Sequence, residues 1–399
     1  MSALDIYAQV SALLDPHLDE RVDPSTRERL VLLVVGMLRA KSASPARIAQ
    51  ALQELGLTQA TAESIERRIR RIENDPELEV TLCFHPFARE RLLFGHPKEL
   101  VLILDPTTQD DRVVMLSASV WYRGRALPLA WLVWPANQPL VGVGFWQQVA
   151  TLLEMVAGIL PVGIPITWVA DRAFGTPAFI DLILARGWHY LVRVQGQTRC
   201  QDGQGGCLRI DQLVHRVGGR AKLRGWVFKK HGWRKATVVV YWGPRHQTPL
   251  CLVSDLPPRW SLIGTYRRRY PIEATFRDYK SMGWRWEQGQ VTDLDHLERL
   301  LVGMALATWV ALYVGTQVAE EHLTTPPTGR RRTVPWVGKR SLFSLGLARI
   351  NELLTQQKDV LLCWELLHWH APTWHQQIYF HHARAFVFAS RKETRSSTA

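Results

Sequence analysis

The chain has 399 residues, enough for two or three domains, and its 47% hydrophobic content is that of an ordinary globular protein. A formal net charge of +13 favours a polyanionic partner, either nucleic acid or an anionic membrane. The five cysteines are odd in number and lack C-x-x-C spacing, which argues against a disulfide scaffold and favours a reduced, cytosolic protein. Asp5 and Asp15 interrupt the first apolar residues, so we expect no secretory signal.

The first part of the chain, to about residue 74, has helical periodicity. RERLVLLVVGMLRA predicts one helix, and Ser44 with Pro45 predicts the start of another that stops at Gly56. TAESIERRIRRIEN predicts a further helix with four arginines, Arg67, Arg68, Arg70 and Arg71. This pattern suits a helix-turn-helix that enters a DNA groove, and it suits a helical bundle with solvated arginines equally well.

Two apolar runs, each followed by an aspartate, predict buried strands. Residues 100–104 precede Asp105, and residues 166–170 precede Asp171, so each carboxylate would be held at the rim of a sheet. Between them, RVVMLSASVWYRGRALPLAWLVW predicts a hairpin and GFWQQVATLLEMVAG a helix. A helix from Thr176 and Pro177 and a strand at HYLVRV follow.

The stretch TYRRRYPIEATFRDYK, residues 265–280, gathers a distinctive set of side chains. At about 100° per residue of helix, four of them fall within an arc of roughly 60°: Tyr266, Arg269, Glu273 and Lys280. Such a face suits a phosphate, whereas the plain alternative is a solvated charged helix. Pro271 suits a first-turn position, so Tyr266 and Arg269 could instead lie on a preceding turn or kinked segment.

At these residues the sequence resembles the DDE-type transposases of bacterial insertion sequences, in the insertion-sequence-four-like group with a Tyr, Arg, Glu, Lys signature. The family spacing is Tyr-x2-Arg-x3-Glu-x6-Lys, which Tyr266, Arg269, Glu273 and Lys280 fit throughout. The resemblance implies a ribonuclease-H-like core in which Asp105, Asp171 and the signature glutamate act together. Arg172, directly after the second aspartate, also fits a common family pattern.

The resemblance also implies an activity and roles for the residues. Asp105, Asp171 and Glu273 would hold two divalent cations, Mg²⁺ or Mn²⁺, for 3′ nicking, hairpin formation, hairpin opening and strand transfer. Arg269 and Lys280 would grip phosphates beside the scissile bond, and Tyr266 a phosphate near the transposon end. The partner would be double-stranded DNA, both terminal inverted repeats and target, bound by a homodimer. The resemblance also favours DNA binding by the predicted helix TAESIERRIRRIEN, with Arg67, Arg68 and Arg71 as the contacts.

The segment of about residues 195–255 is rich in Gly, Arg and short β-like runs, which predicts an inserted β domain. By resemblance, such an insertion handles the DNA hairpin through a stacking tryptophan. Trp226, Trp233 and Trp242 are the candidates, and each could equally be a packing residue.

After the signature, LERLLVGMALATWVALYVGTQVA has the apolar length of a membrane span. Polar interruptions and close flanking charges favour a helix buried against the sheet, and we expect no membrane association. The tail contains Cys363 and a group of histidines, but their spacing matches no common zinc pattern. The last residues, SRKETRSSTA, predict disorder.

The predicted fold class is α/β: a ribonuclease-H-like catalytic domain at 96–320 with the β insertion, after an N-terminal helical DNA-binding domain at 1–78. A helical basic region with a disordered tail would follow at 321–399. The predicted function is a cytoplasmic, nucleoid-associated cut-and-paste transposase. The rival is a catalytically idle descendant that binds DNA or regulates, which would be free to lose its carboxylates.

Overall fold

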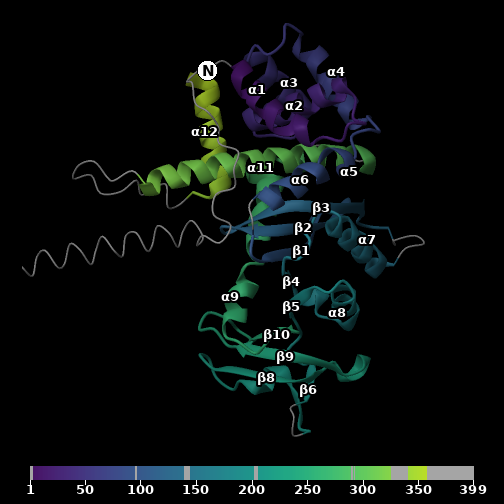
Figure 1. Cartoon of the computed structure of the whole chain (residues 1–399), viewed down its shortest axis with the longest axis vertical. Coiled ribbons are helices and arrows are strands. Elements are labelled where there is room, and N and C mark those ends of the chain that lie inside the picture. The colour runs from purple at the N-terminus through teal and green to yellow at the C-terminus, as the bar shows by residue number, and fades with distance from the viewer. Residues whose placement is uncertain are drawn as a thin grey trace, which may run out of the picture. The chain divides into compact units, whose positions relative to one another are not determined.

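The computed structural model describes residues 3–94, 97–138, 144–201, 205–288, 291, 293–324 and 340–356. The protein is a mixed α/β structure whose described residues pack as two compact units (Figure 1). Unit 1 contains the helices before the sheet, the hairpin turn Tyr122–Arg125 and the described residues from Arg277 onward. Unit 2 contains Pro97–Trp121 and Ala126–Phe276. Cys363, the histidines of the tail and the expected disordered end all lie outside the described residues.

Unit 1 is helical. The three helices predicted before residue 74 are confirmed as α2, α3 and α4, and α3 begins at Pro45 after the N-cap Ser44. Gly56, directly after the α3 C-cap, has a φ of +65°, which glycine adopts without strain. The α-helices of the unit are α1 Ala3–Leu14, α2 Pro24–Ala40, α3 Pro45–Glu54, α4 Ala62–Glu73, α5 Val80–Cys83, α6 His85–Phe94, α11 Leu294–Thr324 and α12 Leu342–Gln356.

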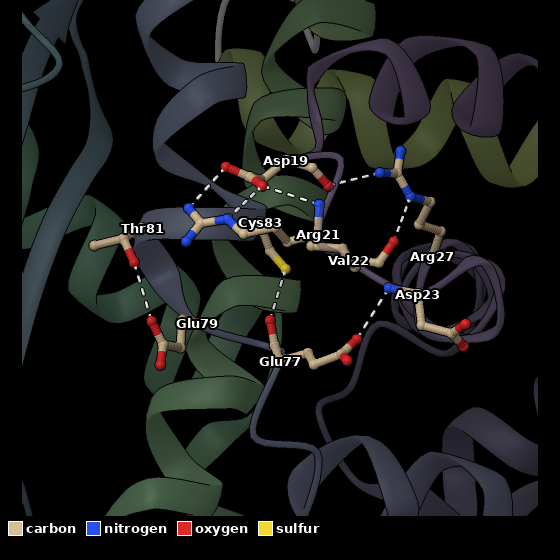
Figure 2. Close-up of polar contacts among 9 residues, drawn as sticks. All are labelled: Asp19, Arg21, Val22, Asp23, Arg27, Glu77, Glu79, Thr81 and Cys83. Atoms are coloured by element: carbon tan, nitrogen blue, oxygen red, sulfur yellow. Dashed lines mark hydrogen bonds and ion pairs between the residues drawn. The ribbon is translucent and has the colours of Figure 1, made fainter.

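A polar network joins the start of α2 to the segment before α6 (Figure 2). The Asp23 carboxylate caps α2 by accepting from the Ser25 amide, and the Asp23 amide donates to Glu77 Oε2 at 2.9 Å. Arg27 donates to the carbonyls of Asp19 and Val22 at 2.6 and 2.9 Å. Because these bonds satisfy backbone groups that no helix pairs, they fix the entry of the chain into α2.

Helix α11 is the apolar centre of unit 1. Its segment Leu294–Glu321 is long and apolar enough to cross a membrane, yet 89% of its most apolar window is buried inside the protein. It packs mainly on α2, α4 and α12, so the predicted burial is confirmed, but its main partners are helices and not the sheet that the sequence suggested. Where α11 crosses α12, a Cβ on Gly315 would lie 1.8 Å from the Leu342 carbonyl oxygen. The two backbones therefore approach as closely as glycine allows.

Two ion pairs of unit 1 involve the hairpin turn. Arg125 pairs with Asp278 and both side chains are buried, while Arg123 Nη1 lies 2.7 Å from Glu320 Oε1 on α11. The turn itself has positive φ at Arg123 and Gly124, as a tight two-residue hairpin requires. The predicted hairpin is therefore confirmed.

Unit 2 is built on one ten-stranded sheet with the order β3-β2-β1-β4-β5-β10-β9-β8-β6-β7 (Figure 1). Strand β1 pairs antiparallel with β2 and parallel with β4, and β5 continues parallel beside β4. Helices α7 Phe145–Ala157 and α8 Pro177–Leu184 accompany it. The strands are β1 Leu100–Gln109, β2 Val113–Tyr122, β3 Arg125–Pro135, β4 Ile166–Ala170, β5 His189–Arg193, β6 Arg199–Gln201, β7 Cys207–Arg209, β8 Arg220–Val227, β9 Arg234–Tyr241 and β10 Leu250–Ser254.

Two expectations about this sheet need correction. Strand β1 does not end at Asp105 but continues to Gln109, because residues 105–109 keep pairing with β2 after the parallel pairing with β4 stops at Leu104. The segment around 195–255 is β-rich as predicted, yet it forms no sheet of its own. Strand β10 pairs with β5, so β6–β10 extend the same sheet.

The signature stretch is not one helix. Helix α9 Ser261–Arg267 ends before Arg269, α10 Pro271–Arg277 begins at the proline, and a π-helical turn Asp278–Met282 carries Lys280. The predicted single face of about 60° is therefore wrong, because it assumed a uniform rotation per residue across Pro271 and beyond Arg277. The alternative, that Tyr266 and Arg269 lie on a segment separate from the helix that begins at Pro271, is confirmed.

Candidate functional site

Strand register brings three charged residues into one row. Leu104 is level with Ala170 on β4, and Ala170 is level with Val192 on β5. The next residues along these parallel strands are Asp105, Asp171 and Arg193, so they follow one another across neighbouring strands about 4.8 Å apart. Arg193 Nη1 accordingly lies 4.0 Å from Asp171 Oδ1. The row stands where the parallel pairing ends.

Glu273 joins this row through an arginine. Arg269 lies in the connection between α9 and α10, and its Nη1 donates to Asp105 Oδ2 at 2.8 Å. Its Nη2 donates to Glu273 Oε1, in the first turn of α10, at 2.6 Å. One guanidinium therefore links a strand residue to a helix residue that is distant in sequence. We call Asp105, Asp171, Glu273 and Arg269 the carboxylate site.

Exposure differs sharply across the carboxylate site. The Arg269 side chain is 8% exposed and that of Asp105 15%, whereas Glu273 is 59% exposed. The site is therefore closed at Asp105 and open at Glu273. The exposed ring of Tyr270 lies beside the opening, with its centroid 5.3 Å from the Arg269 guanidinium.

Tyr266 is buried beneath the site. Its hydroxyl lies 3.5 Å from Asp171 Oδ1, at the limit of a hydrogen bond, and its ring packs edge-on against Tyr270. Burial raises the pKa of the Tyr266 hydroxyl, so it stays a neutral donor. In this arrangement the Tyr266 hydroxyl faces a carboxylate and not the solvent, whereas the resemblance implied that it contacts a DNA phosphate.

The electrostatics of Asp105 reflect crowding by like charges. Burial raises the pKa of the Asp105 carboxyl to about 6, the positive charge of Arg269 opposes that rise, and the charges of Asp171 and Glu273 add to it. The three carboxylates thus interact electrostatically. A cation at this place relieves their mutual repulsion.

The carboxylates suit a divalent metal in chemistry. All three supply hard oxygen donors, which Mg²⁺ and Mn²⁺ prefer. Across the residues that the structure describes, however, no three acidic, imidazole or thiol side chains converge as a metal-binding group. The oxygen donors therefore fit the predicted metals in chemistry. Because Arg269 lies between Asp105 and Glu273, these donors are not already arranged around a metal position.

The other predicted contacts lie in unit 1. Lys280 Nζ is 4.0 Å from Glu287 Oε1, which lies on the separate 3-10 turn Trp286–Gln288. On α4, Arg67 pairs with Glu63, while Arg68 and Arg71 are exposed and make no ion pair with any residue in the described ranges. Buried Ile65, Ile69 and Ile72 hold the opposite face of α4. The arginines therefore project from a packed helix.

The three candidate tryptophans differ in exposure. Trp226 is 45% exposed and is among the most exposed large apolar side chains of the described residues. Trp233 and Trp242 are half-buried, and the Trp242 indole donates to the His246 carbonyl at 2.9 Å. Trp226 is therefore the candidate with most free ring surface.

Sequence reasoning missed Arg193. The signal was present, because Arg193 ends a buried strand just as Asp171 follows one. Only the parallel pairing of β4 with β5 shows that the two ends meet.

Comparison with known protein families gives a match that includes most of the carboxylate site. Residues 147–310 match the family described as Transposase DDE domain, a range that includes Asp171 and the whole signature but not Asp105. This match supports a DNA transposase of the DDE type. No curated protein matches the sequence.

Among solved structures, the chain is similar to one described as "Cryo-EM structure of piggyBac transposase synaptic complex with hairpin DNA". The identity is 11% and the TM-score 0.39, with 85% of this chain and 87% of that chain covered.

Proposed function

We propose that this protein is a cut-and-paste transposase of the insertion-sequence-four-like group. It would nick DNA at the ends of an insertion sequence, form and open a DNA hairpin, and join the ends to target DNA. The main support for this proposal is that Asp105 and Asp171 lie side by side where the parallel pairing of β1 with β4 ends. Arg269 hydrogen-bonds to both Asp105 and Glu273 and so holds Glu273 close to Asp105. Sheet order β3-β2-β1-β4-β5 supports a ribonuclease-H-like core.

The proposed cofactor is a pair of Mg²⁺ or Mn²⁺ ions held by Asp105, Asp171 and Glu273. When bound, such ions stabilise charge on the attacking and leaving oxygens of an in-line displacement. The protein would contribute the arrangement of the carboxylates and cations that hold the scissile phosphate. Arg193, half-exposed beside Asp171, is the cation proposed for that phosphate. Lys280, in unit 1, is proposed as a separate contact to a DNA phosphate.

The rival function is a catalytically idle DNA-binding or regulatory protein. A relic would keep a basic surface without needing carboxylates in one place. Asp105 is costly to keep, because burial disfavours its charged form and raises the pKa of its carboxyl to about 6. Retention of this arrangement favours an active enzyme over a relic.

Cleavage of inverted-repeat DNA by the full chain tests this proposal. Asp171→Asn should abolish Mg²⁺-dependent nicking and leave DNA binding largely intact, since the variant removes a metal donor and no cation. Asp181→Asn is a matched control, because Asp181 lies on α8 and pairs with Arg234. Full cleavage by Asp171→Asn would assign the chemistry to another site, and absence of cleavage by the wild type would favour the idle rival.

DNA ends are proposed to bind at α3 and α4. The exposed arginines of α4 are separated from its buried isoleucine face, as a helix that presents one side to DNA requires. Arginine contacts to DNA phosphates release bound counterions, so DNA binding should weaken steeply as the salt concentration rises. A homodimer on DNA, located in the cytoplasm at the nucleoid, completes the proposal.

A second proposed DNA contact is the β8 face, formed by Arg220, Lys222, Arg224 and Trp226. These residues alternate along β8 and all four are exposed. Between Asp211 and Asp255 the chain has nine Lys or Arg residues and no acidic one. A basic strand that ends in an exposed indole suits a DNA backbone with an unstacked base, so Trp226 is the proposed stacking residue.

A further inference from the structure

The inference concerns Arg269 and rests on the proposed function. We propose that Arg269 is an internal counter-ion that competes with the divalent metal for Asp105 and Glu273. A DNA phosphate would draw its guanidinium away and thereby open the carboxylates to metal. Arg269 would then couple metal binding to DNA binding, so the carboxylate site is loaded only when substrate is present.

The competition follows from which atoms Arg269 uses. Its two terminal nitrogens donate to Asp105 Oδ2 and Glu273 Oε1, at 2.8 and 2.6 Å. These belong to two of the three proposed metal donors. A dication and a guanidinium within one small, partly buried site also repel each other strongly. Full metal coordination therefore requires Arg269 to leave at least one carboxylate.

The surroundings allow Arg269 to leave. It lies between α9 and α10, outside both helices, and its Nε is buried without a hydrogen-bond partner in the described part of the chain. That unsatisfied donor makes the bridging position less favourable than its two ion pairs suggest. Glu273 and Tyr270 are exposed, so the side chain has an open direction toward solvent and DNA.

A thermodynamic consequence distinguishes this role from simple phosphate binding. If DNA removes Arg269 from the carboxylates, DNA raises the affinity for metal, and metal must raise the affinity for DNA by the same factor. Without Arg269, that part of the coupling disappears. A residue that only gripped phosphate would weaken DNA binding when removed and leave DNA-free metal binding unchanged.

The experiment titrates the full chain with Mn²⁺ and measures free Mn²⁺ by electron paramagnetic resonance, with and without inverted-repeat duplex. Arg269→Gln should bind Mn²⁺ about tenfold tighter than the wild type without DNA, which corresponds to about 1.4 kcal/mol. Duplex should raise the affinity of the wild type but not of the variant. Arg267→Gln, an exposed arginine on α9, is the matched control and should behave like the wild type.

Removing a buried cation can unfold the site, so Arg269→Lys is a second variant, with circular dichroism melts for both. Lysine keeps the charge but not the two-pronged geometry, and its Mn²⁺ affinity should lie between the other two. Equal or weaker DNA-free Mn²⁺ binding by folded Arg269→Gln overturns the proposal. If binding then still disappears in Asp105→Asn, the proposed function survives. Absence of Mn²⁺ binding by every variant, even with duplex, overturns both.

Discussion

The guanidinium of Arg269 lies 2.8 Å from the carboxylate of Asp105, although 164 positions separate them in sequence. This contact joins the connection before α10 to the middle of β1 inside unit 2. It places a positive charge where three carboxylates would otherwise repel one another. The pair therefore stabilises the free protein and, on our proposal, must separate before metal enters.

Arg193 should matter for catalysis more than for binding. Arg193→Ala is expected to slow single-turnover nicking about 10-fold to 100-fold, because a cation beside Asp171 helps hold the scissile phosphate in line. Equilibrium DNA binding should fall by much less. Arg199→Ala, an exposed arginine on β6, should change neither quantity. A larger effect on binding than on nicking would contradict the assignment.

Asp105 should make stability depend on pH. Burial raises its pKa from the ordinary 3.8 to about 6 in the folded protein, so the folded state binds the proton more tightly. Stability from this group is full below about pH 4 and falls by about 3 kcal/mol as pH rises through about 6. Asp105→Asn should therefore gain several degrees in Tm relative to the wild type between pH 4 and pH 7, measured by calorimetry. A constant difference in Tm would show that Asp105 titrates normally.

The buried pair Arg125 and Asp278 should be costly to break on one side. Asp278→Asn leaves a buried guanidinium unpaired, and we expect a loss of about 3–5 kcal/mol in the free energy of unfolding. The double variant Arg125→Met, Asp278→Leu should lose less, because no charge remains buried. Chemical denaturation measures both. Arg112→Ala, which breaks an exposed pair with Asp110, should stay within about 1 kcal/mol of wild type.

Arginines of α4 should set the salt dependence of DNA binding. Replacing both Arg68 and Arg71 by Ala removes two exposed cations, so the slope of log K against log salt should fall by about 2. Arg70→Ala serves as the control on the same helix, since Arg70 already pairs with Glu66. Fluorescence anisotropy at several salt concentrations gives the slopes. Unchanged slopes in the double variant would assign end binding to another surface.

Trp226 should affect hairpin steps selectively. Trp226→Ala is expected to reduce hairpin formation about tenfold or more while first-strand nicking continues, because stacking of an unpaired base is worth about 1–3 kcal/mol. Trp242→Ala is the comparison, since its indole is already bonded to His246. Gel analysis of nicked and hairpin products separates the two steps. If Trp242→Ala proves the more damaging, the stacking role does not belong to the β8 face.

The sequence by itself determined the local elements of this protein. Apolar runs predicted β1, β4 and β5, Pro45 and Pro271 predicted helix starts, and Asp171 was correctly expected after a buried strand. These features depend on near neighbours in the chain, through backbone geometry and side-chain periodicity. The spacing of the signature residues is likewise a property of the sequence, but the single helical face that we inferred from it was wrong.

Only the tertiary structure decided how these elements meet. Asp105 lies within β1 because β2 continues to pair beyond it, and Arg193 reaches Asp171 because β4 and β5 are parallel and in register. Arg269 points to carboxylates because burial leaves its charge no water, so it binds the nearest opposite charges. Such contacts depend on residues far apart in sequence, whose pairing no local pattern specifies.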